Sequence, residues 1–331
     1  MHRSINLSSD PFSLAPFADA GALISFYTRF GCDGVELILC GEDFGGKLRP
    51  GMVRGLHLIF YPEWISLWQN DFAYLDREFG SRKAWQEFYQ ATCADDLLHI
   101  YRHELSVAKS LGAEYVVFHI GDNALREYFT LHPRRTDREI IDTSCEFLNV
   151  LFGADEYPFS LLMENLWLEG MNLTDPEMTH RMLEGVRHPK KGLMLDTGHL
   201  LITNPSLRTS SEACEYIHRI LDTHESLIPF IAGVHLHGAL TGDYLLTAQS
   251  QKPPVNGSYL DKFARTAGHL SRIDPHLPLI DPEVPALIRR MDPDFLVYEL
   301  SRKSMSGWES ALSGQRAVFL QSERETSVYE K

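Results

Sequence analysis

The chain has 331 residues, of which 44% are apolar and 23% charged, and its formal net charge is −14. This composition is typical of a soluble globular protein. The acidic excess disfavours a nucleic acid or an anionic membrane as partner, because phosphate binding relies on clustered Lys and Arg. No apolar run approaches the roughly 20 residues of a membrane span, and the N-terminus lacks the apolar core of a secretory signal. The five cysteines are dispersed without a CxxC pair, which predicts reduced thiols in a cytoplasmic protein.

Eight short apolar runs alternate with longer amphipathic segments along the chain. The runs are rich in Val, Ile, Leu and aromatic residues and too short for buried helices, which is the pattern of strands buried on both faces. The predicted strands are 4–9, 34–40, 55–61, 115–121, 160–166, 192–198, 231–238 and 295–300.

Helix boundaries are recognisable between these runs. The segments Thr136–Glu139 and Thr209–Glu212 each fit a capping box that opens a helix. Pro176 stands where a first helical turn is expected, and Gly192 where the following helix would end. A helix over 97–111 is expected to lead into the next strand.

Eight buried strands that alternate with helices predict a (β/α)8 TIM barrel, as a single domain over 1–331. The rival is a doubly wound open sheet, but no GxGxxG follows any predicted strand. The barrel core is expected over about 4–300 and a helical tail over 301–331. Because the chain exceeds the usual barrel length of about 250 residues, we expect long insertions after strands three and seven, at 61–96 and 238–286.

Almost every predicted strand carries a histidine or a carboxylate at or near its C-terminal end. In a barrel these ends meet on one rim, where so many imidazole and carboxylate groups would repel or desolvate one another without a cation. Both groups are ligands for Zn, Mn, Co or Fe. The pattern therefore predicts a divalent-metal site, whose candidates are His57, His119, Glu164, Asp196, His237 and Glu299, with His199 just past strand six.

These residues also have structural interpretations. A lone strand-end histidine, such as His57 or His119, is more often a hydrogen-bonded core residue than a ligand. The carboxylates that end strands five, six and eight are harder to explain, since none of these strands carries an arginine beside them. In GVHLHG, His235 and His237 point to the same side of the strand. His237 is the expected ligand, and the deeper His235 a hydrogen-bonded supporter.

Two further features have open interpretations. The basic cluster HPRRTDRE (132–139) would either grip a phosphate or carboxylate, or form a solvated loop that enters a capped helix. Tyr61, Trp64 and Trp68 would either form an apolar wall against a sugar ring or belong to the core beneath the insertion. The sequence does not choose between these alternatives.

The motifs resemble those of the xylose isomerase-like TIM barrels, a superfamily that includes sugar-phosphate isomerases and epimerases and the zinc-dependent apurinic endonucleases. The resemblance lies in GVEL at strand two, HIG at strand four, MEN at strand five, LDTGH at strand six, HLHG at strand seven and a Glu ending strand eight. It covers about residues 4–300. LDTGH is the most specific motif, and the order Glu, Asp, His, Glu over the last four strands is more telling still.

The epimerase-like members imply one divalent metal, Zn, Mn or Co, held by a strand-end residue from each of the last four strands. The implied ligands are Glu164, Asp196, His237 and Glu299. The two glutamates would be catalytic, moving a proton at a carbon of a small sugar or sugar phosphate. His199 would contact the substrate or bind a further metal. The full set of expected substrate contacts is His199, His235, Trp64 and Asn165.

The chain also departs from the epimerases. They often carry an Arg shortly after the strand-seven His, where this chain has Asp243. His57 and His119 occupy positions at which the endonucleases bind another zinc, so a dinuclear centre bridged by Glu164 is an alternative. Such a centre suits hydrolysis of a phosphoester. The Asp-x-His pair that holds the endonucleases' third zinc is not evident after strand seven.

The sequence therefore predicts a metal-dependent isomerase or epimerase of a small sugar or sugar phosphate, with one or two divalent ions per chain. The first alternative is a dinuclear-metal hydrolase of a small phosphoester that does not bind DNA. The second is a non-catalytic metabolite-binding barrel. We expect a small-molecule substrate, no nucleic-acid or membrane partner and, by resemblance to the superfamily, a homo-oligomer.

Overall fold

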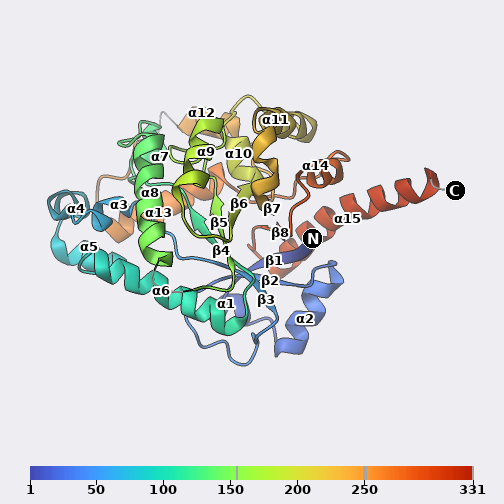
Figure 1. Ribbon diagram of the computed structural model, residues 1–331, viewed down its shortest axis with the longest axis horizontal. Helices are drawn as coiled ribbons and strands as arrows, with labels where there is room; N and C mark the ends of the chain where they lie inside the picture. Colours follow the sequence, from blue (N-terminus) through green and yellow to red (C-terminus); the bar gives the residue numbers. More distant parts are fainter. Residues whose placement is uncertain (154–155, 249–251, 330–331) are drawn as a thin grey trace.

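The computed structural model describes residues 1–153, 156–248 and 252–329. Eight parallel strands form a closed barrel in chain order, with β1 paired to β8, and helices surround it (Figure 1). The (β/α)8 fold predicted from the sequence is confirmed. The strands are β1 (His2–Ser8), β2 (Gly34–Ile38), β3 (Val53–His57), β4 (Tyr115–His119), β5 (Ser160–Glu164), β6 (Lys191–Asp196), β7 (Ile231–Leu236) and β8 (Phe295–Tyr298).

The helices begin and end largely where local sequence signals place them. The two predicted capping boxes are present, at Thr136 and Thr209, and Pro176 opens its helix behind the N-cap Asp175. The helices are α1 (Pro11–Leu14), α2 (Ala20–Arg29), α3 (Ile65–Trp68), α4 (Phe72–Phe79), α5 (Arg82–Tyr89), α6 (Ala94–Leu111), α7 (Glu127–Thr130), α8 (Asp137–Phe152), α9 (Pro176–Gly185), α10 (Thr197–Ile202), α11 (Ser210–Thr223), the 3-10 helix η1 (Glu225–Phe230), α12 (Gly242–Ala248), α13 (Tyr259–Ile273), α14 (Val284–Met291) and α15 (Met305–Tyr329).

The prediction that Gly192 ends a helix is wrong. The helix ends at Gly185, and Gly192 lies inside β6. A Cβ at this position would lie 2.9 Å from the carbonyl oxygen of Phe230 and 3.0 Å from the Cβ of Ala232. The glycine is therefore explained by the close approach of the neighbouring strand.

The interior of the barrel explains why the candidate residues gather at one end. Side chains that point inward alternate along each strand. On β4 the inward series begins at Tyr115 and ends at His119. On β8 it begins at Phe295 and continues to Glu299, directly after the strand. The N-terminal members pack into an apolar cluster inside the barrel, so the polar side chains stand on a packed floor at the C-terminal end.

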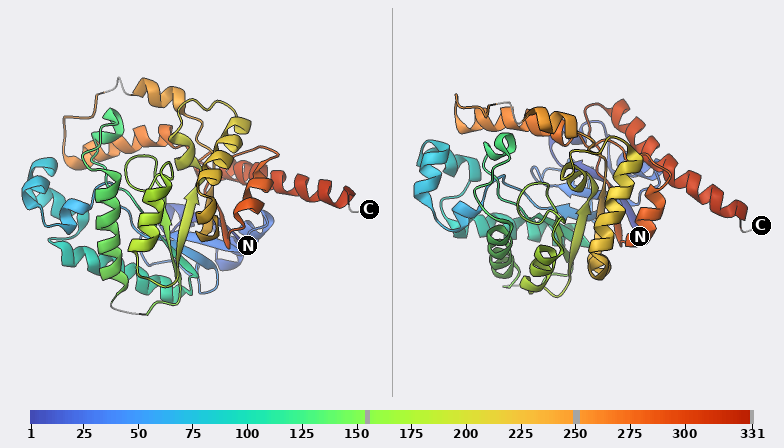
Figure 2. Two further views of the ribbon diagram at one scale, coloured as in Figure 1. Left: turned by 45° about the horizontal axis from the view of Figure 1, so that its top comes forward. Right: turned by 90° about the horizontal axis from the view of Figure 1, so that it is seen from above.

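Extra helices occupy the two segments in which insertions were predicted. Helices α3–α5 lie between β3 and the barrel helix α6, and α12 and α13 lie between β7 and α14. The two segments touch each other: the rings of Phe79 and Tyr259 stack with centroids 3.7 Å apart, and Phe88 packs on Tyr259 as well. They thus form one layer beside the C-terminal end of the barrel (Figure 2).

The C-terminal helix α15 begins at Met305, within the predicted tail, and runs away from the barrel (Figures 1 and 2). Its first turns are anchored by Trp308 and Leu312, both fully buried. Across the described part of the chain, no helix has the length and apolar character needed to cross a bilayer. All five cysteines are unpaired. That the whole chain is one domain stays a prediction.

Candidate metal centre

Ligand-type side chains of the described residues meet at the C-terminal end of the barrel in four overlapping groups, of which three are numbered here from β3 onward. Group 1 consists of His57, His119 and Glu164. Glu164 Oε2 lies 3.1 Å from His57 Nε2 and 3.2 Å from His119 Nε2, and the two nitrogens are 3.0 Å apart. Ligands at about 2.0–2.2 Å from a tetrahedral zinc ion lie about 3.3 Å from one another. The three atoms are therefore close to the spacing of a metal site.

Group 2 consists of Glu164, Asp196 and His235, with Glu299 beside them. The Nδ1 atom of His235 lies 3.5 Å from Glu164 Oε2, 3.8 Å from Asp196 Oδ2 and 3.0 Å from Glu299 Oε2. Although His235 Nδ1 and Glu299 Oε2 are close, neither makes a hydrogen bond of acceptable angle. A cation that binds both atoms would require them to face each other in this way without a hydrogen bond between them.

The other nitrogen of His235 is held from behind by Glu36, on β2. His235 Nε2 lies 2.9 Å from Glu36 Oε1, and the Tyr115 hydroxyl donates to Glu36 Oε2 over 2.8 Å. This partner fixes the Nε2 proton and leaves the Nδ1 lone pair directed at the carboxylates. Metal-binding histidines commonly have such a carboxylate behind them. Glu36 was not recognised as functional, although it is a charged residue in an apolar strand.

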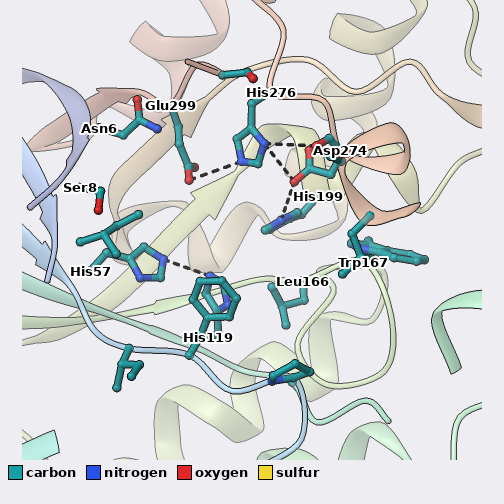
Figure 3. A pocket seen from close by; sticks show the side chains of 18 of the residues that line it. Asn6, Ser8, His57, His119, Leu166, Trp167, His199, Asp274, His276 and Glu299 are labelled. Carbon is teal, nitrogen blue, oxygen red and sulfur yellow. Dashed lines mark hydrogen bonds and ion pairs between the residues drawn. The ribbon is translucent and has the colours of Figure 1, made fainter. Parts of the chain in front are cut away.

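Group 3 consists of His237, Asp274 and His276, with His199 beside them. Asp274 Oδ2 lies 3.3 Å from His199 Nε2 and 3.5 Å from His276 Nδ1 (Figure 3). Asp274 Oδ1 is 3.7 Å from His237 Nδ1. His199 Nδ1 lies 3.0 Å from the carbonyl oxygen of Asn165, which leaves Nε2 as the nitrogen that faces group 3. Asp274-Pro275-His276 is thus an Asp-x-His sequence after β7 that reaches the site, which was not predicted.

Backbone pairing far along the chain brings this pair to the site. Gly238, just after β7, and Leu277 form an antiparallel bridge and exchange both backbone hydrogen bonds. The intervening segment contains α12 and α13, so the pair returns to the end of β7 only after a long excursion. His276 has φ +48°, a left-handed conformation that costs free energy for a non-glycine residue and is enriched at functional sites.

The LDTGH segment can now be explained atom by atom. Asp196 ends β6 and caps α10, where its Oδ1 accepts a hydrogen bond from the His199 backbone N–H over 2.6 Å. Its Oδ2 lies 2.9 Å from His237 Nε2. A Cβ on Gly198 would fall 1.9 Å from the His237 ring, so only glycine leaves room for that imidazole. Asp196 therefore has both roles, helix cap and candidate ligand.

The carboxylates and imidazoles of the centre are buried together, so their charges depend on one another. Burial would raise the pKa of Glu164, but the surrounding imidazoles, His119 and His235 foremost, hold the pKa well below its usual range. Burial would lower the pKa of His57, yet the contact with Glu164 raises it to about 9. Four buried atoms of the centre remain without a hydrogen-bond partner, and all four are of ligand type: Nδ1 of His235, Nδ1 of His237, Oδ1 of Asp274 and Oε2 of Glu299. These donors fit divalent cations.

The four expected substrate contacts occupy two different positions. His199 and Trp64 line the cavity beside the centre, although Trp64 is only 2% exposed and donates its Nε1–H to the Gly121 carbonyl. Asn165 is fully buried, and its amide bonds to both the N–H and the C=O of Asp196. His235 is fully buried as well. The geometry of Asn165 and His235 favours positioning and metal binding over substrate contact.

The centre opens into a cavity of about 490 Å³. Among the described residues that line it are His57, His119, His199, Asp274, His276 and Glu299 (Figure 3). The volume is that of a small-molecule site.

The basic cluster at 132–139 has another role, because Arg134 and Arg135 both donate to Asp122 Oδ2. Asp243 is 83% exposed and paired with Arg208, away from the three groups.

Comparisons with known proteins agree with this architecture. Three similar solved structures are a D-tagatose 3-epimerase-like protein (14% identity, TM-score 0.51, covering 100% of this chain and 99% of that one), endonuclease IV from Thermus thermophilus (13%, 0.49, 97% and 100%) and an L-ribulose 3-epimerase (12%, 0.48, 100% and 99%). At 14% identity, the likeness to the first of these structures shows the fold alone. No curated protein matches the chain in sequence.

The family match is more specific. Residues 90–273, more than half of the chain, match the model of the xylose isomerase-like TIM barrels. This range includes HIG, MEN, LDTGH and HLHG, the motifs on which the resemblance rests. The chain belongs to the xylose isomerase-like TIM barrel family.

Proposed function

We propose that the protein is a metal-dependent hydrolase of a small phosphoester, with divalent ions bound by groups 1, 2 and 3. One observation carries the proposal: the Glu164 carboxylate faces the imidazoles of group 1 and of group 2 at the same time. Its Oε2 faces His57, His119 and His235, and its Oε1 lies 3.3 Å from His199 Nδ1. A carboxylate surrounded in this way suits a ligand that bridges two ions.

The same observation argues against the isomerase expected from the sequence. In that mechanism Glu164 moves a proton at a substrate carbon, which requires it to reach the substrate. Glu164 is 1% exposed, and the carboxylates that line the cavity among the described residues are Asp274 and Glu299. Only one of the two expected catalytic glutamates therefore faces the cavity.

When bound, such ions activate a water molecule and stabilise the leaving oxygen of a phosphoester. The chain's own residues would hold and orient them. Glu164 would bridge groups 1 and 2, Glu36 would fix His235, and Asn165 would fix Asp196 through its backbone. Imidazole and carboxylate ligands are compatible with Zn, Mn or Co. A small substrate is favoured over DNA by the net charge of −14 and by the size of the cavity.

Epimerisation is the second candidate, because one observation favours it. Asp196, His237 and Glu299 form a further ligand-type group that would hold a single ion, as in the predicted epimerase site. A D-tagatose 3-epimerase-like protein shares the fold. This candidate requires Glu164 to leave its imidazole partners, whereas the hydrolase uses them as they stand.

Metal content per chain separates the two functions. The protein is purified without chelator or affinity-tag metal, loaded with Zn or Mn, and analysed by elemental analysis beside assays with bis(4-nitrophenyl) phosphate and with ketoses. The hydrolase requires two or three equivalents, and His57→Ala should remove one of them together with phosphodiester turnover.

The matched control is His188→Ala, which removes a buried histidine at the opposite end of the barrel. It should keep its metal. One equivalent that survives in His57→Ala, with ketose turnover, would establish the epimerase instead. Failure to bind metal under any loading condition would overturn both functions.

A further inference from the structure

The cavity beside the metal groups has two chemically different sides, and we infer that it binds a phosphoester that carries an apolar ring rather than a polyhydroxylated sugar. The phosphoester half of this inference rests on the proposed function. The ring half rests on the cavity walls alone.

The apolar side is built by the segments that follow β3 and β5. Its side chains are only partly buried, and Phe60 is 51% exposed. Exposed apolar side chains are usually scattered singly over a protein surface. Several of them together on a concave surface are typical of a ligand site. The residues of this side are Ile59, Phe60, Tyr61, Leu166 and Trp167.

This apolar side begins directly at group 1. The Phe60 ring centroid lies 4.7 Å from that of His119 and 6.0 Å from that of His57. A ligand whose phosphoryl group sits on the metal groups would therefore place the next part of its structure against Phe60. Aromatic rings in contact at such spacing attract one another beyond the effect of buried area.

The polar side lies elsewhere on the rim. Asn6 and Ser8, from β1, stand apart from Leu166 and Trp167 in the cavity (Figure 3). A sugar needs hydrogen-bond partners around its whole ring, since unpaired hydroxyls are costly in an apolar environment. The segments after β3 and β5 contribute apolar side chains where a sugar would need such partners.

One buried donor independently supports a ligand in this cavity. Asn123 lines the cavity, is 1% exposed, and its Nδ2 has no hydrogen-bond partner. A buried donor without a partner is destabilising unless a ligand supplies an acceptor. The side chain lies beside the apolar wall, with its Oδ1 3.8 Å from the position of a Cβ on Gly121.

The test compares two phosphonates that cannot be hydrolysed at a P–O–C bond. Phenylphosphonate and methylphosphonate are titrated calorimetrically into the full, metal-loaded chain, with glucose 6-phosphate as the sugar probe. We expect phenylphosphonate to bind about tenfold more tightly than methylphosphonate. Phe60→Ala should remove most of that ratio, because it should weaken the binding of phenylphosphonate far more than that of methylphosphonate.

The matched control is Phe12→Ala, which removes another exposed phenylalanine, 77% exposed on α1. It should change neither affinity. Equal affinities for the two phosphonates, or tighter binding of glucose 6-phosphate than of phenylphosphonate, would overturn the inference.

Turnover of bis(4-nitrophenyl) phosphate, measured on the same samples, tests the proposed function separately. Hydrolysis without a preference for the ring would overturn this inference and leave the proposed function intact. A preference for the ring without hydrolysis of any phosphoester would support the inference and overturn the proposed function.

Discussion

Two buried acidic clusters lie near the C-terminal end of the barrel, and they are neutralised in different ways. One is the metal centre formed by groups 1 to 3. The other, here called the Glu63 network, lies beneath the first insertion and consists of Glu63, Tyr74, Asp122, Arg134 and Tyr259. Glu63 and Asp122 of the network and Glu164 and Asp196 of the metal centre are almost completely buried, whereas Asp274 and Glu299 face the cavity.

In the Glu63 network the protein's own groups satisfy each carboxylate oxygen. Asp122 Oδ1 accepts from the backbone N–H groups of Trp64 and Ile65, and Oδ2 accepts from Arg134 and Arg135. Glu63 accepts hydrogen bonds from two tyrosine hydroxyls. The metal centre has imidazoles in place of arginines and leaves ligand atoms unpaired. Burial of acids therefore does not by itself mark a metal site; burial with unpaired, converging ligand atoms does.

The largest effect is expected where the metal centre loses its shared ligand. Glu164→Gln keeps the volume but replaces one ligand oxygen by an NH2 group, so groups 1 and 2 should both lose metal. Turnover should fall by more than about 100-fold, which exceeds the usual effect of changing a residue behind a ligand. Elemental analysis and phosphodiester turnover measure the two losses.

The matched control is Glu104→Gln. Glu104 is also buried, but it accepts a hydrogen bond from the Ile59 backbone N–H and belongs to neither cluster. It should keep full metal content. If Glu164→Gln did so too, a bridging role for Glu164 would be untenable.

A smaller effect is expected behind the ligands. In Glu36→Gln the amide can still form a hydrogen bond with His235, but it lacks the negative charge that raises the basicity of His235 Nδ1. We expect metal affinity to fall by about 10- to 100-fold, measured by competition with a chromophoric chelator. A role confined to packing would leave the affinity unchanged and alter only the free energy of unfolding.

The sequence predicts most of the barrel and of groups 1 and 2, because both depend on local pattern. Buried parallel strands are short apolar runs, and their ends carry His57, His119, Glu164, Asp196 and Glu299 in register. The strand predicted over 192–198 extends beyond β6, which ends at Asp196. The reason is that the carboxylate at the end of this strand also caps the next helix.

Asp274, His276 and Glu36 were missed for a different reason, although His237 and His199, the other members of group 3, were predicted. The pair at Asp274 and His276 reaches the site only through the pairing of Gly238 with Leu277, which no local pattern encodes. Glu36 acts through His235, which lies across the barrel on β7. Contacts of this kind depend on the closed barrel and not on spacing along the chain.

Chelation should lower the melting temperature of the protein through the metal centre, because the Glu63 network needs no ion. Without the ions, only protonated imidazoles balance the carboxylates of Glu164, Asp196, Asp274 and Glu299. About 3 kcal/mol of binding free energy is lost, so the melting temperature should fall by several degrees. Differential scanning fluorimetry with and without EDTA measures the shift. His57→Ala, with fewer ions to lose, should shift less, and an equal shift would argue against metal at group 1.

A separate effect concerns the pH dependence of the Glu63 network. Burial, with Asp122 and Glu78 adding to it, raises the pKa of Glu63 from its ordinary value of 4.5 to about 8. Between these two values the folded state keeps the Glu63 proton while the unfolded state has released it. The free energy of unfolding should therefore fall as pH rises through this window, by up to about 1.4 kcal/mol per pH unit.

Glu63→Gln carries no such proton, so its free energy of unfolding should depend less on pH. Urea unfolding of metal-free protein between pH 5.5 and 8 measures the difference, with Glu104→Gln as the control. Burial raises the pKa of Glu104 to about 7. Both variants should therefore make the free energy of unfolding less dependent on pH below pH 7, whereas only Glu63→Gln should do so above pH 7. Parallel curves for the unaltered chain and Glu63→Gln would mean that Arg134 and the tyrosines neutralise a Glu63 that is already ionised, and the two acidic clusters would then differ only in their unpaired ligand atoms.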